Sequence, residues 1–193
     1  MNTSARLSER RVTSALLLLG FLCGLGGVLM FSNRYYGGSQ FLPGYVTWER
    51  GLIGAAAVAI LFGFVLLAAT LRAAGERRFS WIGLGTLALG TVLTLLVEWR
   101  TIVTGQEGQG WMQLLIAAFV VLTFLGQAAY GAAVLQTALL PHWAGWLLVI
   151  WNLAWLVVVF AFSARDPYYP ALFYLGPLVL GILLLRSSSA LTH

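Results

Sequence analysis

Four charged residues beside long apolar segments are the first candidates for chemistry. Glu98 is the only acid near the interior of such a segment, Arg100 follows it, and Glu49 and Arg50 stand at the start of another. Ionisable groups within apolar membrane segments are functional candidates by default. Because side chains two residues apart do not face each other on a helix, Glu98 is predicted to pair across helices, with Arg50 for example, and not with Arg100. An interfacial ion pair is the expected role, and a polar mouth for a substrate or ion is the functional alternative.

Two uncharged polar residues, Gln127 and Asn152, lie within later apolar segments. Counted from the ends of their segments, they are predicted at a similar depth on consecutive antiparallel helices. A hydrogen bond between them, worth about 0.6–2 kcal/mol in a membrane, is the expected role, and contact with a substrate is the alternative. The candidate polar path therefore consists of Glu49, Arg50, Glu98, Arg100, Gln127 and Asn152.

Other chemistries lack the residues they need. The sequence has no lysine, which excludes a Schiff base and a P-loop lysine. The single cysteine, Cys23, cannot form an internal disulfide, and the two histidines, His142 and His193, do not supply a catalytic zinc site. His142 is expected to be an interfacial residue, with an axial ligand to haem or chlorophyll as the alternative. We predict no catalytic residue, no bound metal and no cofactor.

The composition indicates which solvent surrounds these residues. Hydrophobic residues make up 60% of the 193 residues and charged residues only 9%, whereas a soluble domain carries about 25% charged residues. The net charge of +5 comes from arginines scattered between apolar segments, and a nucleic-acid-binding protein would gather them in one patch. The sequence therefore predicts an integral membrane protein, with the lipid bilayer as its partner and no nucleic acid.

Six apolar windows approach the roughly 20 residues that a membrane-spanning helix needs. They are Thr13–Phe31, Gly51–Leu71, Phe79–Trp99, Trp111–Leu135, Trp143–Phe162 and Tyr169–Leu185, and the last is short and contains Pro177. The expected fold is all-α: a polytopic membrane protein with six transmembrane helices in a single domain, residues 1–193. Trp151 and Trp155 lie within a span, four residues apart, so they are expected to pack inside the protein and not to anchor it at an interface.

The arginines predict the orientation of these helices. If the N-terminus is cytoplasmic, the inner segments hold seven arginines against two glutamates, and the outer segments hold four arginines against four acids. Excess positive charge marks the cytoplasmic side. We therefore predict a multi-pass protein of the inner (cytoplasmic) membrane with both termini inside. A reporter that is active only after export, fused after His193, should be inactive.

Stripes of small and polar residues run along three of the predicted helices. Small residues permit close helix approach in lipid, so each stripe is expected to form a helix–helix contact, and the lining of a cavity is the alternative. The stripes include Gly20, Gly24 and Gly27; Gly83, Gly90, Thr94 and Glu98; and Thr123, Gln127, Tyr130 and Gly131. The connection Ser32–Arg50 combines glycines and Pro43 with aromatic residues, and we expect it to be non-helical. It should fold over the bundle or lie at the interface, or else dock a partner.

The segment Leu139–Leu148, which reads Leu-Leu-Pro-His-Trp-Ala-Gly-Trp-Leu-Leu, carries a resemblance. It resembles the junction between helices four and five in small bacterial six-helix integral membrane proteins of unknown function. In those proteins a leucine-proline-basic-tryptophan-x-glycine-tryptophan pattern recurs, and His142 stands where arginine is usual. The resemblance implies a bacterial origin and an uncharacterised role.

Taken together, these features favour a non-enzymatic accessory or interaction component of the cytoplasmic membrane, associating with other membrane-protein subunits. The alternative is a small-molecule or ion transporter or channel, whose polar path would use Glu98, Gln127 and Asn152.

Overall fold

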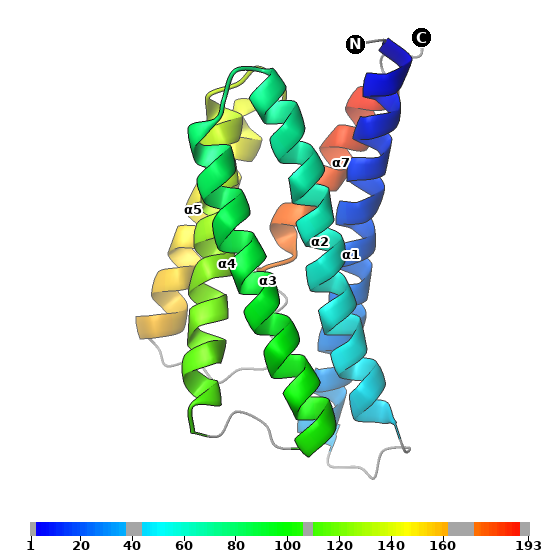
Figure 1. Ribbon diagram of the computed structural model, residues 1–193, viewed down its shortest axis with the longest axis vertical. Coiled ribbons are helices and arrows are strands. Elements are labelled where there is room, and N and C mark those ends of the chain that lie inside the picture. The colour runs from blue at the N-terminus through cyan, green and yellow to red at the C-terminus, as the bar shows by residue number, and fades with distance from the viewer. Residues whose placement is uncertain (1–2, 38–43, 106–109, 162–171, 190–193) are drawn as a thin grey trace.

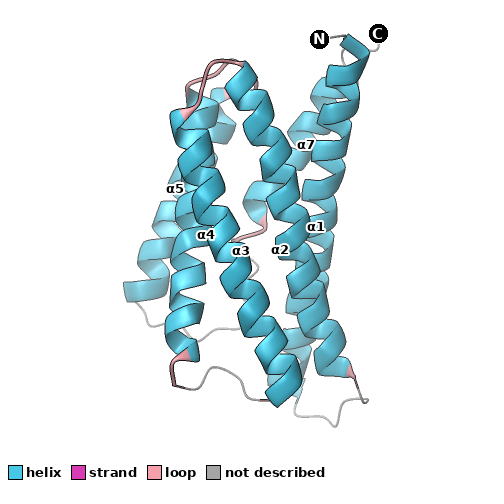
Figure 2. Ribbon diagram, in the orientation of Figure 1, coloured by secondary structure: helices cyan, strands magenta, loops and turns pink. Residues whose placement is uncertain are grey.

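The computed structural model describes residues 3–37, 44–105, 110–161 and 172–189, which form a bundle of α-helices (Figure 1, Figure 2). The helices are α1 (Thr3–Gly37), α2 (Tyr45–Ala73), α3 (Arg78–Thr104), α4 (Met112–Leu135), α5 (His142–Ala161) and α7 (Leu175–Ser189). Five of them, α1 to α5, are long and apolar enough to cross a membrane. The chain is therefore an all-α protein with the composition of a membrane-embedded one.

The first five predicted windows each overlap one of these long helices, but the prediction for the segment Ser32–Arg50 was wrong. Helix α1 continues through Tyr35 and Tyr36 to Gly37, and α2 already begins at Tyr45. The hydroxyl of Tyr45 donates a hydrogen bond to the carbonyl oxygen of Met30 at 3.0 Å, so the two helix ends are joined directly. The predicted lid or docking segment now reduces to residues 38–43, which lie outside the described residues.

The sixth predicted window, Tyr169–Leu185, corresponds only in part to a helix. Helix α7 starts at Leu175 and is shorter than the other five, and residues 169–171 lie outside the described residues. Pro177 falls in its first turn, where a helix leaves the backbone N–H groups unpaired and the missing N–H of proline costs nothing. Phe173 and Tyr174 form a turn just before α7, and both side chains are buried in the bundle.

The helices follow one another around the bundle (Figure 1). Helix α1 packs against both α2 and α7, α3 packs against α4, and α4 packs against α5. The start of α1, the end of α7 and the α2–α3 turn all lie at the same end of the molecule. Helix α2 therefore connects the α1–α7 side of the bundle to the α3–α4–α5 side.

The α2–α3 turn is short and well capped. Gly75 adopts a φ of 99°, a left-handed conformation that glycine adopts without strain. The buried carboxylate of Glu76 accepts hydrogen bonds from the backbone N–H groups of Phe79 (2.7 Å) and Ser80 (3.0 Å), and from the Ser80 hydroxyl. These contacts satisfy orphan donors at the start of α3 and fix its angle to α2.

Most residues of the small-residue stripes lie at helix–helix contacts. A Cβ atom added at Gly20 would lie 3.2 Å from the Ala56 carbonyl oxygen, and one added at Gly83 would lie 3.0 Å from that of Gly126. Two residues of the stripes have different neighbours from the rest. Gly24 packs against the Tyr174 ring, and the Glu98 carboxylate accepts a hydrogen bond from Arg50 of α2. Close packing is thus the main role of the glycines, while the polar ends of the stripes have partners of their own.

Candidate functional site

A cluster of two arginines and two glutamates joins α1, α2 and α3 at the end of the bundle opposite the α2–α3 turn. Nε and Nη2 of Arg34 donate to the two carboxylate oxygens of Glu49 at 2.7 and 3.0 Å. Nε of Arg50 lies 3.1 Å from Oε1 of Glu49, and Nη1 of Arg50 donates to Oε2 of Glu98 at 3.2 Å. The predicted cross-helix pair between Arg50 and Glu98 is confirmed. We call these four residues the ionic cluster.

The ionic cluster is shielded from solvent, and its formal charges cancel. The Glu49 side chain is fully buried, and only 11% of the Arg50 side chain and 8% of the Glu98 side chain are exposed. The ring of Phe31 lies 5.4 Å from the guanidinium carbon of Arg34 and 5.1 Å from that of Arg50, within the range of cation–π attraction. Each carboxylate therefore lies against at least one guanidinium group.

Sequence reasoning did not single out Arg34, although it completes the ionic cluster. Its partner Glu49 lies fifteen residues further along, and the helical extension of α1 brings the two together. The pair could have been predicted from the need of Glu49, an acid in an apolar setting, for a cation from another helix. The assumption that the chain was non-helical after Phe31 hid this pair.

Arg100 lies outside this set of contacts, in agreement with the prediction that it does not face Glu98. Its guanidinium carbon lies 4.4 Å from the ring centre of Trp111, the residue just before α4. The contact joins the end of α3 to the start of α4. In this structure Arg100 therefore packs against Trp111.

The predicted hydrogen bond between Gln127 and Asn152 was wrong. Nε2 of Gln127 donates to the carbonyl oxygen of Phe173 at 2.9 Å, and Nδ2 of Asn152 donates to that of Leu148, one turn earlier on its own helix, at 2.7 Å. The physical reason is the turn before α7, whose carbonyl groups lie inside the bundle and need donors. The indole Nε1 of Trp151 satisfies the neighbouring carbonyl oxygen of Leu172 at 3.0 Å.

Trp151 is half-buried and packs against neighbouring residues, which agrees with the predicted packing role. Its ring makes an edge-on contact with Trp155, with centres 5.6 Å apart and planes at 64°. Both tryptophans also line a hollow of about 550 Å³ along the outer side of α5, together with the exposed Trp143 and Trp146. All the residues that line this hollow belong to α5, so it is a feature of one helix surface.

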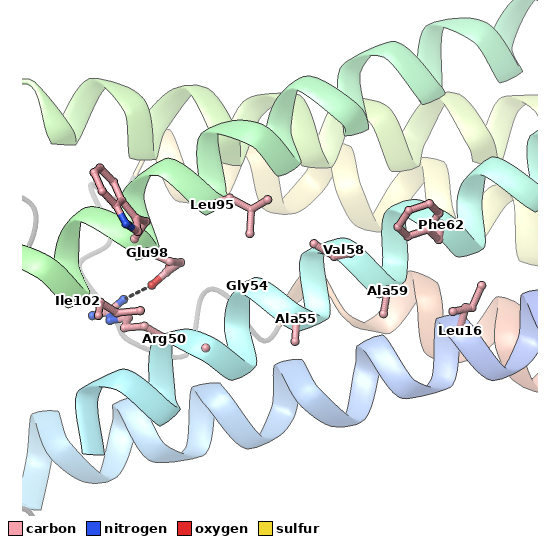
Figure 3. Close-up of a pocket in the computed structure, with 12 residues that line it drawn as sticks. Leu16, Arg50, Gly54, Ala55, Val58, Ala59, Phe62, Leu95, Glu98 and Ile102 are labelled. Carbon is pink, nitrogen blue, oxygen red and sulfur yellow. Dashed lines mark hydrogen bonds and ion pairs between the residues drawn. The ribbon is translucent and has the colours of Figure 1, made fainter. Parts of the chain in front are cut away.

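A groove of about 550 Å³ runs between α2 and α3 and reaches the ionic cluster (Figure 3). Its α2 wall extends from Gly51 to Phe62, and its α3 wall is formed by Leu95, Trp99 and Ile102. Arg50 and Glu98 lie at one end, and Phe62 and Leu16 lie at the other. The groove is apolar except at the end where this ion pair lies.

Small residues create the groove. A Cβ atom added at Gly51 would meet no atom within 4 Å, and one added at Gly54 would meet only Leu95, at 3.3 Å. Ala55 and Ala59 continue the same wall. Beside the contact between Gly54 and Leu95, the short side chains on the exposed side of α2 therefore leave an open hollow at the surface of the bundle.

Within the described residues, no three His, Cys, Asp or Glu side chains come together in a way that could hold a metal ion. The chain matches no family model, no curated protein and no solved structure in the comparisons made. The function is therefore argued from the ionic cluster and the groove themselves.

Proposed function

We propose that this chain is a non-enzymatic accessory component of a bacterial cytoplasmic membrane, and that it acts by holding an apolar membrane molecule in the groove between α2 and α3. One observation carries the proposal: the hollow that reaches the candidate polar residues is an open, apolar groove on the side of the bundle. The volume, about 550 Å³, lies within the usual range of small-molecule sites.

The state of the charged residues supports a binding role over a catalytic one. General acid–base catalysis needs a side chain that can reach a substrate. Glu49 is fully buried between two arginines, and Glu98 is paired with Arg50. These side chains hold α1, α2 and α3 together and give the groove a polar end.

The proposed orientation is six spans with both termini in the cytoplasm, α7 being the sixth. Two observations support it: the start of α1 and the end of α7 lie at one end of the bundle, and Arg72, Arg77 and Arg78 lie at that end too. Export-dependent reporters after His193 and within residues 38–43 test it. The first should be inactive and the second active, and the reverse pattern would refute the orientation.

Site-specific photo-crosslinking tests the proposed binding role. A photoreactive amino acid at Val58, inside the groove, should give one discrete cross-linked product in native membranes. The matched control is Leu89, which is exposed on α3 outside the groove and should give only diffuse labelling. Identical labelling at the two positions would show that nothing specific occupies the groove.

A transporter or channel is the second candidate, and one observation favours it. Oε1 of Gln127 and Oδ1 of Asn152 are buried without a hydrogen-bond partner among the described residues. Buried polar atoms of this kind are uncommon and can mark a site for a solute or water. Ion or solute flux in proteoliposomes that is lost in Gln127→Leu, with the protein still folded, would establish this candidate against the accessory role.

A further inference from the structure

We infer that the α2–α3 groove binds one phospholipid whose head group carries both a phosphate and a primary ammonium, as phosphatidylethanolamine does. The inference rests on the proposed binding role of the groove and names its ligand. It is carried by the length of the groove, by the position and charge of its polar end, and by the space left at Gly51.

The length of the groove matches a lipid tail better than a partner helix. Phe62 follows Arg50 by twelve residues on one helix, which is about 18 Å at 1.5 Å per residue. One leaflet of a bilayer has a hydrocarbon depth of roughly 15 Å, half of a core about 30 Å thick. A membrane-spanning helix would need a groove along the whole core. An acyl chain of one leaflet needs only a groove of about this length.

The polar end of the groove lies where a head group would be. The exposed side chains of Trp48, Trp99 and Trp111 lie at the same ends of α2, α3 and α4 as Arg50 and Glu98. Tryptophan is enriched at the level of the head groups. A lipid with its tail along Ala55, Val58 and Phe62 would therefore place its head beside the ion pair.

The charges at this end select the kind of head group. Arg50 offers a guanidinium, which suits a phosphate, and Glu98 offers a carboxylate, which suits an ammonium. Because the four charges of the ionic cluster cancel, an anionic head group would gain no net attraction and would meet the Glu98 carboxylate. A head group with both charges complements the pair. A primary ammonium can also donate hydrogen bonds to Glu98, whereas the quaternary ammonium of a choline head has no N–H group.

A substitution at Gly51 would block the space that the lipid tail is proposed to occupy. Gly51 lies next to Arg50 on the α2 wall, and a side chain there would enter the groove without meeting a protein atom within 4 Å of its Cβ. Gly85 on α3 has the same open surroundings but does not line the groove. Gly51→Leu and Gly85→Leu therefore form a matched pair with the same change of residue in two helices.

Native mass spectrometry of the full chain in mild detergent tests the inference. The protein is titrated with phosphatidylethanolamine, phosphatidylcholine and phosphatidylglycerol of identical acyl chains. The wild-type protein should bind one phosphatidylethanolamine about tenfold more tightly than either other lipid, the effect of one additional charge-assisted hydrogen bond. Gly51→Leu should lose this binding, and Gly85→Leu should keep it.

Glu98→Gln separates head-group recognition from tail binding. It should still bind lipid in the groove but should bind phosphatidylethanolamine and phosphatidylcholine equally, with folding checked by thermal unfolding. Equal binding of these two lipids by the wild-type protein, or unchanged phosphatidylethanolamine binding by Gly51→Leu, would overturn the inference. A protein, in place of a lipid, cross-linked at Val58 would also overturn it while leaving the proposed binding role intact.

Discussion

Helix α2 meets its neighbours α1 and α3 in opposite ways. Against α1 there is no spare room: a Cβ atom at Gly27 would lie 3.1 Å from the Glu49 carbonyl oxygen and 2.6 Å from the Ile53 side chain. On the α3 side, a Cβ atom at Gly54 would lie 3.3 Å from the Leu95 side chain, but one at the exposed Gly51 would meet no atom within 4 Å. Glycine permits close approach at the first interface and leaves a hollow at the second, so a small residue in a membrane helix does not by itself indicate contact.

Two polar contacts join α2 to α3 and α4. At one end Arg50 pairs with Glu98, and fourteen residues further along the hydroxyl of Tyr130 donates to the Phe64 carbonyl oxygen at 2.9 Å. The rings of Phe64 and Tyr130 also pack together, with centres 4.5 Å apart. Together with the contact between Gly54 and Leu95, these polar contacts fix the position of α2 relative to α3 and α4.

Replacement of Glu49 by glutamine should cause the largest loss of stability, because Glu49 takes part in the contacts of α2 with both α1 and α3. Its carboxylate receives Arg34 from α1 and lies beside Arg50, which continues to Glu98 on α3. Removing one charge from a buried set of this kind costs about 3 kcal/mol. Glu49→Gln should lower the free energy of unfolding by that amount in a denaturant titration in mixed micelles.

The control for this loss is Glu9→Gln. Glu9 is a half-buried acid near the start of α1, and its replacement should change the stability by less than about 0.5 kcal/mol. If the two variants unfold alike, the ionic cluster does not anchor α2.

Gly27→Leu should cause the second-largest loss of stability, and it tests only the closely packed interface between α1 and α2. The new side chain would collide with the backbone of α2 at Glu49 and Ile53, which cannot rotate away. Overpacking of this kind costs about 1–3 kcal/mol. The adjacent Gly26 is the matched control, because a Cβ atom there would meet only the Leu52 side chain, at an ordinary 3.5 Å. Thermal unfolding should separate the two variants, and equal melting temperatures would show that α1 and α2 are not in close contact.

Much of this architecture could be predicted from the sequence, for physical reasons that individual elements illustrate. The length of an apolar segment indicates a helix, so each of α2 to α5 overlaps its predicted window, although α2 begins six residues before Gly51 and α3 ends five residues after Trp99. The partner of Glu98 was predictable because a carboxylate in an apolar setting needs a cation, and helical geometry ruled out Arg100.

Other features required the folded structure. Gln127 turned out to donate to the Phe173 carbonyl, and nothing in the spacing of polar residues shows that an irregular turn enters the bundle there. Gly27 and Gly51 both lie in small-residue surroundings, and only the distance to the neighbouring helix distinguishes contact from hollow. Arg34 was hidden because the predicted end of the first helix came six residues too early.

Tyr130→Phe should have a smaller effect, and it probes the second point at which α2 is held. The change removes only the hydroxyl that reaches the Phe64 carbonyl oxygen and keeps the ring contact. A hydrogen bond between membrane helices contributes about 0.6–1.7 kcal/mol. Unfolding of Tyr130→Phe should show a loss in this range, and Tyr35→Phe, at an exposed position, should show none. A loss equal to that of Glu49→Gln would mean that this contact, not the ionic cluster, is the main anchor of α2.

Gly51→Leu should have the smallest effect on stability, although it is the variant expected to abolish lipid binding. The side chain enters the groove and meets no protein atom near its Cβ, and leucine favours a helix over glycine by up to about 1 kcal/mol. The free energy of unfolding in detergent should therefore stay the same or rise slightly, as for Gly85→Leu. If Gly51→Leu lost as much stability as Gly27→Leu, the space beside Gly51 would have to be filled by protein in the membrane, and the groove would not be open. Unchanged stability combined with lost lipid binding is the result that only an open groove explains.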